Sequence, residues 1–237
     1  MTTQQKNPDM FMSMPHQCSY LPERTATTLF VDPRCALDSK GYGRFIRLGF
    51  RRSGDLVYRP HCQGCDACLP VRVPADRFTP NRSQRRVWRR NQDLGVRARA
   101  PEYDQEHFEL YRRYQETRHA GGAMDDPDPG KYLSFLASRQ VETVFYEFRL
   151  ADRLLGVAVA DHLPDGLSAV YTFFDPEETR RALGVYAVLW QIARVRSLGL
   201  SSLYLGYLIR ECPKMAYKAN YRPLEAYLNG HWSVLEP

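Results

Sequence analysis

The stretch TVFYEFRLADRLLGVAVADHLPDGLSAVYTFFD, residues 143–175, decides the fold. It contains three successive runs that are rich in β-branched and aromatic residues, which favour strands. Turn residues separate the runs, at Ala151–Asp152 and at Pro164–Gly166. Because short turns join antiparallel neighbours, the stretch predicts a three-stranded antiparallel sheet.

The residues that follow predict a helix and then a further strand. Over about 180–198, apolar side chains recur at helical spacing on one face: Leu183, Tyr186, Leu189, Ile192 and Ala193. SSLYLGYLI (201–209) is typical of a strand. Three antiparallel strands, a helix and a strand is the core order of the GNAT type of acyltransferase fold, although the order occurs in other folds. We therefore expect an α+β protein with a GNAT-like acyltransferase core, an antiparallel-rich mixed sheet flanked by helices.

The chain before residue 143 predicts shorter elements. Strands are expected at 27–31, 55–60 and 69–73, helices at 39–49, 81–95, 104–120 and 131–138, and a loop at 121–130. Asn81 or Ser83 is expected to cap the second of these helices, with Gly95 just past its end. We expect an N-terminal cysteine-bearing basic domain of α/β character over 1–100 and a GNAT-like transferase domain over 101–237.

Composition indicates a globular protein that binds a polyanion. Of 237 residues, 43% are hydrophobic and 25% are charged, and neither a signal peptide nor a membrane span is recognisable, so a cytoplasmic protein is expected. Residues 1–100 hold 18 basic and 8 acidic residues, whereas the remainder hold 15 and 19. Such a local basic surplus favours a nucleic acid partner over an arginine-rich solvated surface.

The helix expected at 81–95 concentrates this charge. Its arginines are Arg82, Arg85, Arg86, Arg89 and Arg90, with Trp88 among them. Like charges four residues apart repel along a helix, so folding alone does not favour this pattern. RNA phosphates would offset the repulsion, and Trp88 would stack on a base or pack inward. The six side chains are therefore candidates for binding nucleic acid.

Three cysteines, Cys62, Cys65 and Cys68, lie three residues apart in YRPHCQGCDACLPVRV (58–73). Clustered thiols in a reducing compartment point to a metal ion or to reactivity, and thiolates ligate zinc or an iron–sulfur cluster. Cys18, His61 or an exogenous ligand would complete a tetrahedral site. The alternative is that reduced thiols pack a turn.

Two further segments have weaker signals. RRALGVY (180–186) partly matches the pattern by which acetyltransferases hold a pyrophosphate at a helix N-terminus, but Tyr186 occupies the last position. Coenzyme A binding is therefore disfavoured. CPKMAYKANYRPLE (212–225) mixes lysines with tyrosines, and its alternative interpretation is a basic surface turn.

Several motifs occur together between about residues 14 and 233. They are Cys18 with Tyr20, GFRRSG (49–54), the cysteine turn at 58–73, YTFFDP (171–176), YLGYLI (204–209) and KMAYKANYRPLE (214–225). Jointly they resemble the aminoacyl-tRNA–protein transferases of the N-degron pathway, above all the bacterial aspartate/glutamate leucyltransferase branch. The resemblance implies transfer of leucine from leucyl-tRNA to an N-terminal Asp or Glu of a protein, which marks that protein for degradation. The partners implied are leucyl-tRNA and such proteins, with no membrane and no cofactor required for the transfer.

The resemblance also bears on the cysteines. Relatives that transfer arginine carry a Cys-x₂-Cys near the start and adjacent cysteines later, implicated in a metal cluster. Here Leu21 stands where their second early cysteine would be, and the later cysteines are spaced. Cys18 is the leading fourth ligand beside Cys62, Cys65 and Cys68, since Cys35 and Cys212 lie outside the matching motifs.

The implied reaction is the aminolysis of an ester, and it makes two demands on the site. The acceptor carboxylate needs a cation, for which the candidates are Arg47, Arg51, Arg52, Lys214 and Lys218. Leucine needs an apolar pocket, for which the candidates are Tyr171, Phe173 and Phe174. The sequence names no general base. Two alternatives stay open: a coenzyme A-dependent N-acetyltransferase, and a non-catalytic metal-knuckle protein that binds tRNA or other RNA.

Overall fold

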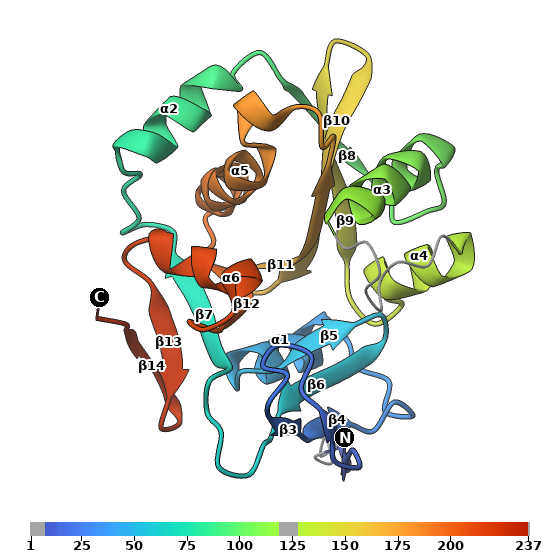
Figure 1. Ribbon diagram of the computed structural model, residues 1–237, viewed down its shortest axis with the longest axis vertical. Helices are drawn as coiled ribbons and strands as arrows, with labels where there is room; N and C mark the ends of the chain where they lie inside the picture. Colours follow the sequence, from blue (N-terminus) through green and yellow to red (C-terminus); the bar gives the residue numbers. More distant parts are fainter. Residues whose placement is uncertain (1–7, 119–127, 237) are drawn as a thin grey trace, which may run out of the picture.

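The computed structural model describes residues 8–118 and 128–236 (Figure 1). Its centre is an eight-stranded sheet in the order β14-β13-β7-β12-β11-β10-β9-β8. The strands are β7 (Leu69–Pro74), β8 (Gly95–Arg99), β9 (Thr143–Leu150), β10 (Arg153–Leu163), β11 (Gly166–Phe174), β12 (Ser202–Leu208), β13 (Glu225–Leu228) and β14 (His231–Val234). β11 and β12 pair in parallel and the other neighbours are antiparallel. The predicted α+β class and the antiparallel meander β9–β11 are confirmed.

Helices cover both faces of the large sheet (Figure 1). α2 (Arg82–Arg90) and α5 (Leu183–Ser197) pack on one face, and α3 (Gln105–Arg118) and α4 (Pro129–Leu136) on the other. β10 shows why: its side chains alternate between the two faces, with Ala158 and Ala160 toward α5 and Val157 and Val159 toward α3 and α4. A strand that is apolar on both faces requires cover on both.

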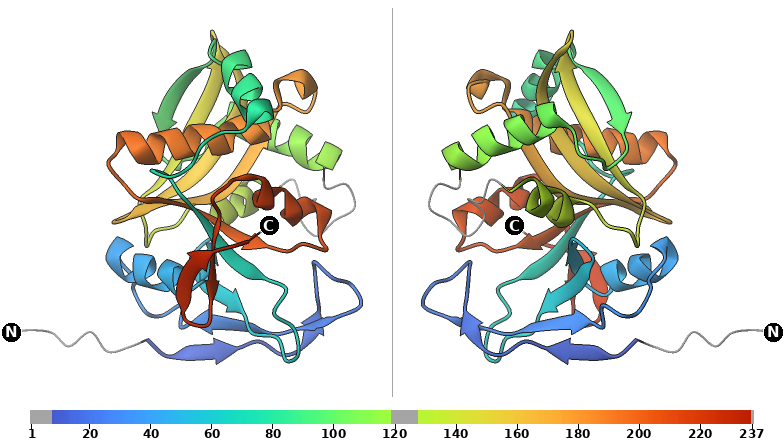
Figure 2. Two further views of the ribbon diagram at one scale, coloured as in Figure 1. Left: turned by 90° about the vertical axis from the view of Figure 1, so that its left-hand side faces the viewer. Right: turned by 90° about the vertical axis from the view of Figure 1, so that its right-hand side faces the viewer.

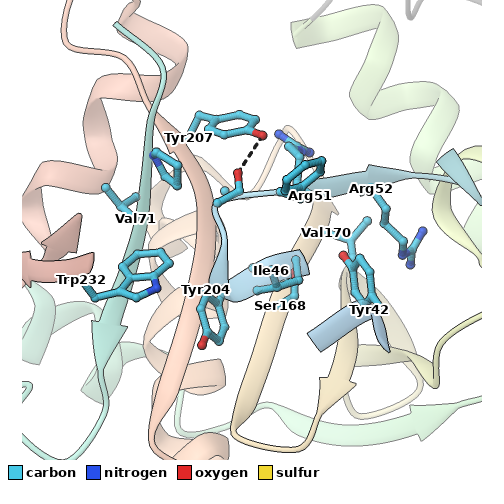
Figure 3. Close-up of a pocket in the computed structure, with 15 residues that line it drawn as sticks. Tyr42, Ile46, Arg51, Arg52, Val71, Ser168, Val170, Tyr204, Tyr207 and Trp232 are labelled. Carbon is cyan, nitrogen blue, oxygen red and sulfur yellow. Dashed lines mark hydrogen bonds between the residues drawn. The ribbon is translucent and has the colours of Figure 1, made fainter. Parts of the chain in front are cut away.

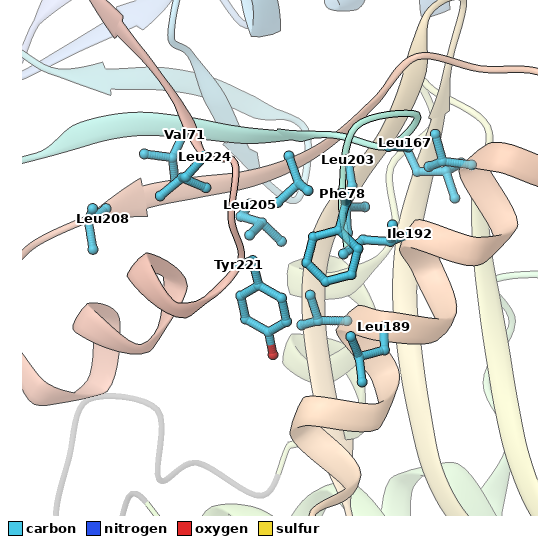
Figure 4. Close-up of a cluster of buried hydrophobic side chains, with 14 of the residues drawn as sticks. Val71, Phe78, Leu167, Leu189, Ile192, Leu203, Leu205, Leu208, Tyr221 and Leu224 are labelled. Atoms are coloured by element: carbon cyan, nitrogen blue, oxygen red, sulfur yellow. The ribbon is translucent and has the colours of Figure 1, made fainter. Parts of the chain in front are cut away.

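The α5 face holds a large apolar core (Figure 4). Leu189 and Ile192 of α5 lie beside Phe78, and Tyr221 from the C-terminal segment closes the same cluster. This segment consists of α6 (Pro213–Ala216) and the 3₁₀ helix η2 (Tyr217–Asn220), which lie between β12 and β13. A second 3₁₀ helix, η1 (Thr179–Arg181), leads into α5.

The N-terminal residues build a second, smaller unit below the large sheet (Figure 2). Its sheet has the order β1-β4-β6-β5, from β1 (Met10–Met12), β4 (Thr28–Val31), β6 (Leu56–Pro60) and β5 (Arg51–Ser53). A two-stranded sheet, β2 (His16–Gln17) and β3 (Thr25–Ala26), and the helix α1 (Ser39–Arg47) accompany it. β7 and β8 also precede residue 100, yet they belong to the large sheet. The division of the chain at residue 100 stays a prediction.

Most predicted elements are confirmed, with differences at their ends. Asn81 caps α2 in a capping box with Gln84, as one of the two predicted caps. The prediction that α2 runs to Gly95 is wrong, because Asn91 caps it after Arg90 and Gly95 begins β8. Of the loop predicted at 121–130, residues 121–127 lie outside the described part of the chain.

Candidate functional site

A β-bulge in β12 organises the candidate site. The register of β12 against β7 shifts between Tyr204 and Gly206, and Gly206 has a φ of 71°. A glycine adopts this left-handed backbone conformation without strain. A Cβ atom at Gly206 would lie 3.5 Å from Nη1 of Arg51. The bulge therefore brings the backbone of β12 close to the guanidinium of Arg51, and the missing side chain of Gly206 leaves space for that guanidinium.

Arg51 is a half-buried cation without an acidic partner. In residues 8–118 and 128–236, no carboxylate pairs with it and no acceptor hydrogen-bonds its guanidinium. Its Cζ atom lies 5.9 Å from the ring centroid of Tyr207 and 6.0 Å from that of Tyr58. The negative faces of these rings offset part of the cost of burying the charge. They leave the hydrogen-bond donors of Arg51 available to an anion.

Figure 3 shows the surroundings of Arg51 on one side. The Tyr207 hydroxyl donates a hydrogen bond of 3.1 Å to the carbonyl of Gly49 beside it. A cavity of about 20 Å³ lies among these residues, Tyr204 and Trp232. This volume admits about one water molecule, so it is too small for an amino-acid side chain.

Lys218 approaches the same bulge from η2. Its side chain is nearly fully buried, its ammonium donates to the carbonyl of Tyr207, and the sulfur of Met215 lies 3.5 Å away. No carboxylate among the described residues pairs with it. Burial, and secondarily the charge of Arg51, lower the pKa of Lys218 to about 7. Lys218 therefore changes charge near neutral pH.

Two groups near these cations have raised pKa values. Burial raises the pKa of the Cys68 thiol to about 12, and burial also raises the pKa of Tyr20 against the opposing charge of Arg51. Arg51 and Lys218 thus lie near aromatic rings and the Cys68 thiol, and no carboxylate of the described residues pairs with them. Because an unpaired buried charge is costly, this arrangement suits a bound anion.

The three other acceptor candidates are placed differently. Arg52 is buried and its guanidinium is occupied: Nε and Nη2 donate to the two carboxylate oxygens of Asp161 at 2.7 and 2.6 Å. Arg47 is partly exposed and its Nη1 atom lies 3.5 Å from Asp165. Lys214 is exposed on α6. Only Arg51 and Lys218 of the five converge.

The arginines of α2 form an exposed row. Arg82, Arg85, Arg86, Arg89 and Arg90 all face solvent, while Gln84 and Val87 are buried beneath them. Trp88 packs inward with its ring 5.7 Å from that of Tyr186, and it remains half-buried. Gln84 donates to the carbonyl of Asn220, which ties α2 to the segment that carries Lys218.

The three aromatic residues of the predicted aminoacyl pocket all lie near tyrosines of α3, and the pocket itself stays a prediction. Phe173 is fully buried, with its ring 5.5 Å from that of Tyr111. Phe174 lies between α3 and α5: its ring is 4.9 Å from that of Tyr114, and a Cβ at Gly184 would lie 3.1 Å from it. Tyr171 is half-buried, with its ring 5.4 Å from that of Phe135.

The cysteines gather near the cation pair. Burial is the main cause of the raised pKa of Cys68, and the nearby thiols of Cys18, Cys62, Cys65 and Cys212 raise it as well. Cys212, which directly precedes α6, therefore joins the three other predicted cysteines near Cys68. Nη1 of Arg24 lies 3.1 Å from the Cys65 sulfur.

In the described residues, no three His, Cys, Asp or Glu side chains are arranged to hold a metal ion. The ligand set Cys18, Cys62, Cys65 and Cys68 stays a prediction. Nor does any helix in that part of the chain have the length and apolar character needed to cross a membrane.

Known proteins match the chain over nearly its whole length. The family described as "Arginine-tRNA-protein transferase, C terminus" matches residues 106–228, and its N-terminal counterpart matches residues 16–86. The chain belongs to the arginine-tRNA-protein transferase family. It is 54% identical over 225 residues to an aspartate/glutamate leucyltransferase of Pseudomonas fluorescens, covering 95% of this chain and 96% of that protein. A Pseudomonas putida protein of the same name matches with the same identity and coverage.

A solved structure gives a weaker likeness. The C-terminal DUF2156 domain of an Agrobacterium fabrum protein has a TM-score of 0.43 at 13% identity, covering 61% of this chain and 48% of that one. A TM-score this low does not establish a shared fold.

Proposed function

We propose that this protein transfers leucine from leucyl-tRNA to the N-terminal Asp or Glu of other proteins, which marks them for degradation through the N-degron pathway. Relatives named aspartate/glutamate leucyltransferase, which match over nearly their whole length, support the donor and the reaction. The observation that carries the acceptor specificity is the pair Arg51 and Lys218, two cations without an acid at one bulge. We further propose a GNAT-like core and a cytoplasmic location, where aminoacyl-tRNA is made.

Arg51 and Lys218 are proposed to bind the acceptor carboxylate. A carboxylate accepts two parallel N–H bonds from a guanidinium, and Arg51 has its donors available. Lys218 adds a second positive charge once the bound carboxylate favours its protonated form. An Asn or Gln side chain in the same place would leave both charges uncompensated, so the site would discriminate the acid from its amide.

The chemical step replaces an ester bond by an amide bond. The neutral α-amine of the acceptor attacks the ester carbonyl of leucyl-tRNA, and the bond to the terminal ribose oxygen then breaks. The amine loses a proton and the departing ribose oxygen gains one, so the reaction consumes no redox equivalent. An α-amine has an ordinary pKa near 8, so a useful fraction is already neutral at pH 7. Positioning would therefore account for much of the rate enhancement.

The exposed row on α2 is proposed to bind tRNA. Arg82, Arg85, Arg86, Arg89 and Arg90 would contact phosphates. Because Gln84 ties α2 to η2, RNA bound there would lie next to the segment that carries Lys218. The leucine pocket is proposed beside Tyr171 and Phe174, whose rings both lie near that of Tyr114, with Phe173 buried in the core behind them. No cofactor is proposed for the transfer.

The test is a transfer assay with a panel of donors and acceptors. Purified protein is incubated with separately charged leucyl-, arginyl- and phenylalanyl-tRNA and with peptides that begin with Asp, Glu, Lys or Arg. Mass spectrometry should find one added leucine on the Asp and Glu peptides only. Transfer only to Lys or Arg peptides, or only from acetyl coenzyme A, would overturn the proposal.

A further inference from the structure

A groove between α2 and α5 remains unexplained by the acceptor site. It encloses about 410 Å³, within the range of ligand pockets. Its apolar lining comes from Phe78, Pro80, Trp88, Leu189, Ile192 and Ala193. Three arginines complete it, Arg85, Arg89 and Arg196, and no acidic residue lines it.

We propose that this groove binds an unpaired nucleotide of the single-stranded 3′ end of the donor tRNA. The proposal rests on the proposed function and adds a site to it. A nucleotide has a flat base that can pack against the apolar walls and a phosphate that can pair with the arginines. RNA-binding proteins recognise unpaired ends by stacking their bases on aromatic side chains or guanidinium planes. Trp88, half-buried in the wall, presents such a surface.

The arginines of the groove divide into two kinds. Arg196 donates to the carbonyls of Ala75 and Phe78, and Arg85 donates to the carbonyl of Pro80 at 2.7 Å. These bonds fix the two side chains at the groove. Arg89 is exposed and makes no hydrogen bond or ion pair with the described residues. It is the side chain best able to reach a phosphate.

The groove adjoins the acceptor site through packed rings. Phe78 in its wall lies 6.3 Å from the ring of Tyr221 (Figure 4). The ring of Tyr221 lies 6.5 Å from that of Tyr217. The ammonium of Lys218 lies 5.7 Å from the ring centroid of Tyr217. A tRNA tail that starts in the groove would therefore run toward the cation pair, where its ester must react. Apolar walls suit the exposed face of a base, and the bases of a duplex are already stacked on one another, so a single-stranded segment is the expected occupant.

The test compares two RNA minihelices that carry no amino acid, one with a short single-stranded 3′ tail and one with a blunt end. Wild-type protein should bind the tailed RNA about tenfold more tightly, because stacking of a base is worth ~1–3 kcal/mol. Ala193→Trp fills the groove without removing a charge, and Arg89→Ala removes its unengaged cation. Both variants should lose most of the preference for the tail. Ala193→Trp should retain its affinity for the blunt RNA, whereas Arg89→Ala, which also removes a cation of the α2 row, should lower that affinity about as much as Arg86→Ala does. Melting temperatures check that both remain folded.

Arg86→Ala is the matched control, since Arg86 lies on the same helix but outside the groove. It should lower the affinity for both RNAs to the same extent. A full tail preference in folded Ala193→Trp, or no preference in the wild type, would overturn the proposal. Displacement of the tail by an Asp-initiated peptide would also overturn it, because the groove would then hold the acceptor. The binding assay requires no leucine transfer. A failure of transfer in the separate activity assay would therefore overturn the proposed function and not the groove.

Discussion

Arg51 of β5 and Lys218 of η2 meet at one bulge of β12, Arg51 against Gly206 and Lys218 against the carbonyl of Tyr207. Neither cation has a carboxylate partner in residues 8–118 and 128–236. Arg52, the neighbour of Arg51, shows the contrast, because Asp161 occupies it fully. Adjacent residues of a strand point to opposite sides, so one arginine stabilises the fold and the other is available to a ligand.

The buried lysine should make stability depend on pH. The pKa of Lys218 is about 7 in the folded protein and 10.5 ordinarily. Between these values the unfolded chain binds more protons, so the free energy of unfolding rises with pH through this window. Below pH 7 the lysine is charged in both states and its burial costs on the order of a few kcal/mol.

The variant Lys218→Met removes that cost. It should stabilise the protein, relative to wild type, more at pH 6 than at pH 10. Urea unfolding at the two pH values measures the difference, and Lys214→Met, at an exposed position, is the control. Equal effects of Lys218→Met at both pH values would contradict a lysine that loses its charge near neutrality.

The ion pair between Arg52 and Asp161 should be required for folding. It joins β5 to β10, and both side chains are buried. Asp161→Asn leaves an uncompensated buried guanidinium and should lower the free energy of unfolding by about 3–5 kcal/mol. Arg112→Met, which breaks the exposed pair with Glu116, should cost at most about 1 kcal/mol. Chemical denaturation of both variants tests this, and similar small costs would show that the buried pair is not a structural requirement.

The row on α2 should determine the salt dependence of tRNA binding. The double variant Arg86→Glu and Arg82→Glu should raise the dissociation constant and reduce the slope of log K against log salt by up to about one for each lost phosphate contact. Arg112→Glu on α3, on the far face of the large sheet, is the charge-matched control for each substitution. Unchanged binding at low salt would mean that α2 is ordinary surface.

The fold could largely be predicted because its signals are local. The alternation in residues 143–175 and the helical spacing over 180–198 produce β9, β10, β11 and α5 where expected. The placement of β7 in the large sheet could not be predicted, because strand pairing depends on contacts remote in sequence. The same limit explains the missed β8, whose residues Gly95–Arg99 are mostly exposed at the sheet edge.

The sequence could predict which cations are candidates for the site, but only the structure shows which of them already have a carboxylate partner. Nothing local in GFRRSG distinguishes Arg51 from Arg52, since the distinction depends on Asp161 in β10. Likewise, Lys214 and Lys218 lie in one polar segment, and only the packing of η2 buries the second. Cys212 joins the other thiols for the same reason.

Metal analysis should decide the role of the cysteines. A content below about a tenth of an equivalent of iron or zinc, in protein purified without oxygen and fully active in transfer, would show that the cysteines are structural or redox-sensing thiols. Elemental analysis and a visible spectrum measure this. Cys65→Ser should then cost stability and little activity. A stoichiometric metal that is lost in Cys65→Ser would contradict this view of the cysteine turn.

The central claim is that Arg51 recognises the acceptor carboxylate. The most direct measurement is the ratio of leucine transfer rates, kcat/KM, for matched peptides that begin with Asp and with Asn. Wild-type protein should strongly prefer Asp, and Arg51→Met should lose at least about thirtyfold on the Asp peptide, since removing one member of a buried charge pair costs about 2–5 kcal/mol. Its tRNA affinity should not change, and Arg47→Met should retain the preference. An Asp preference that survives in folded Arg51→Met would contradict the account.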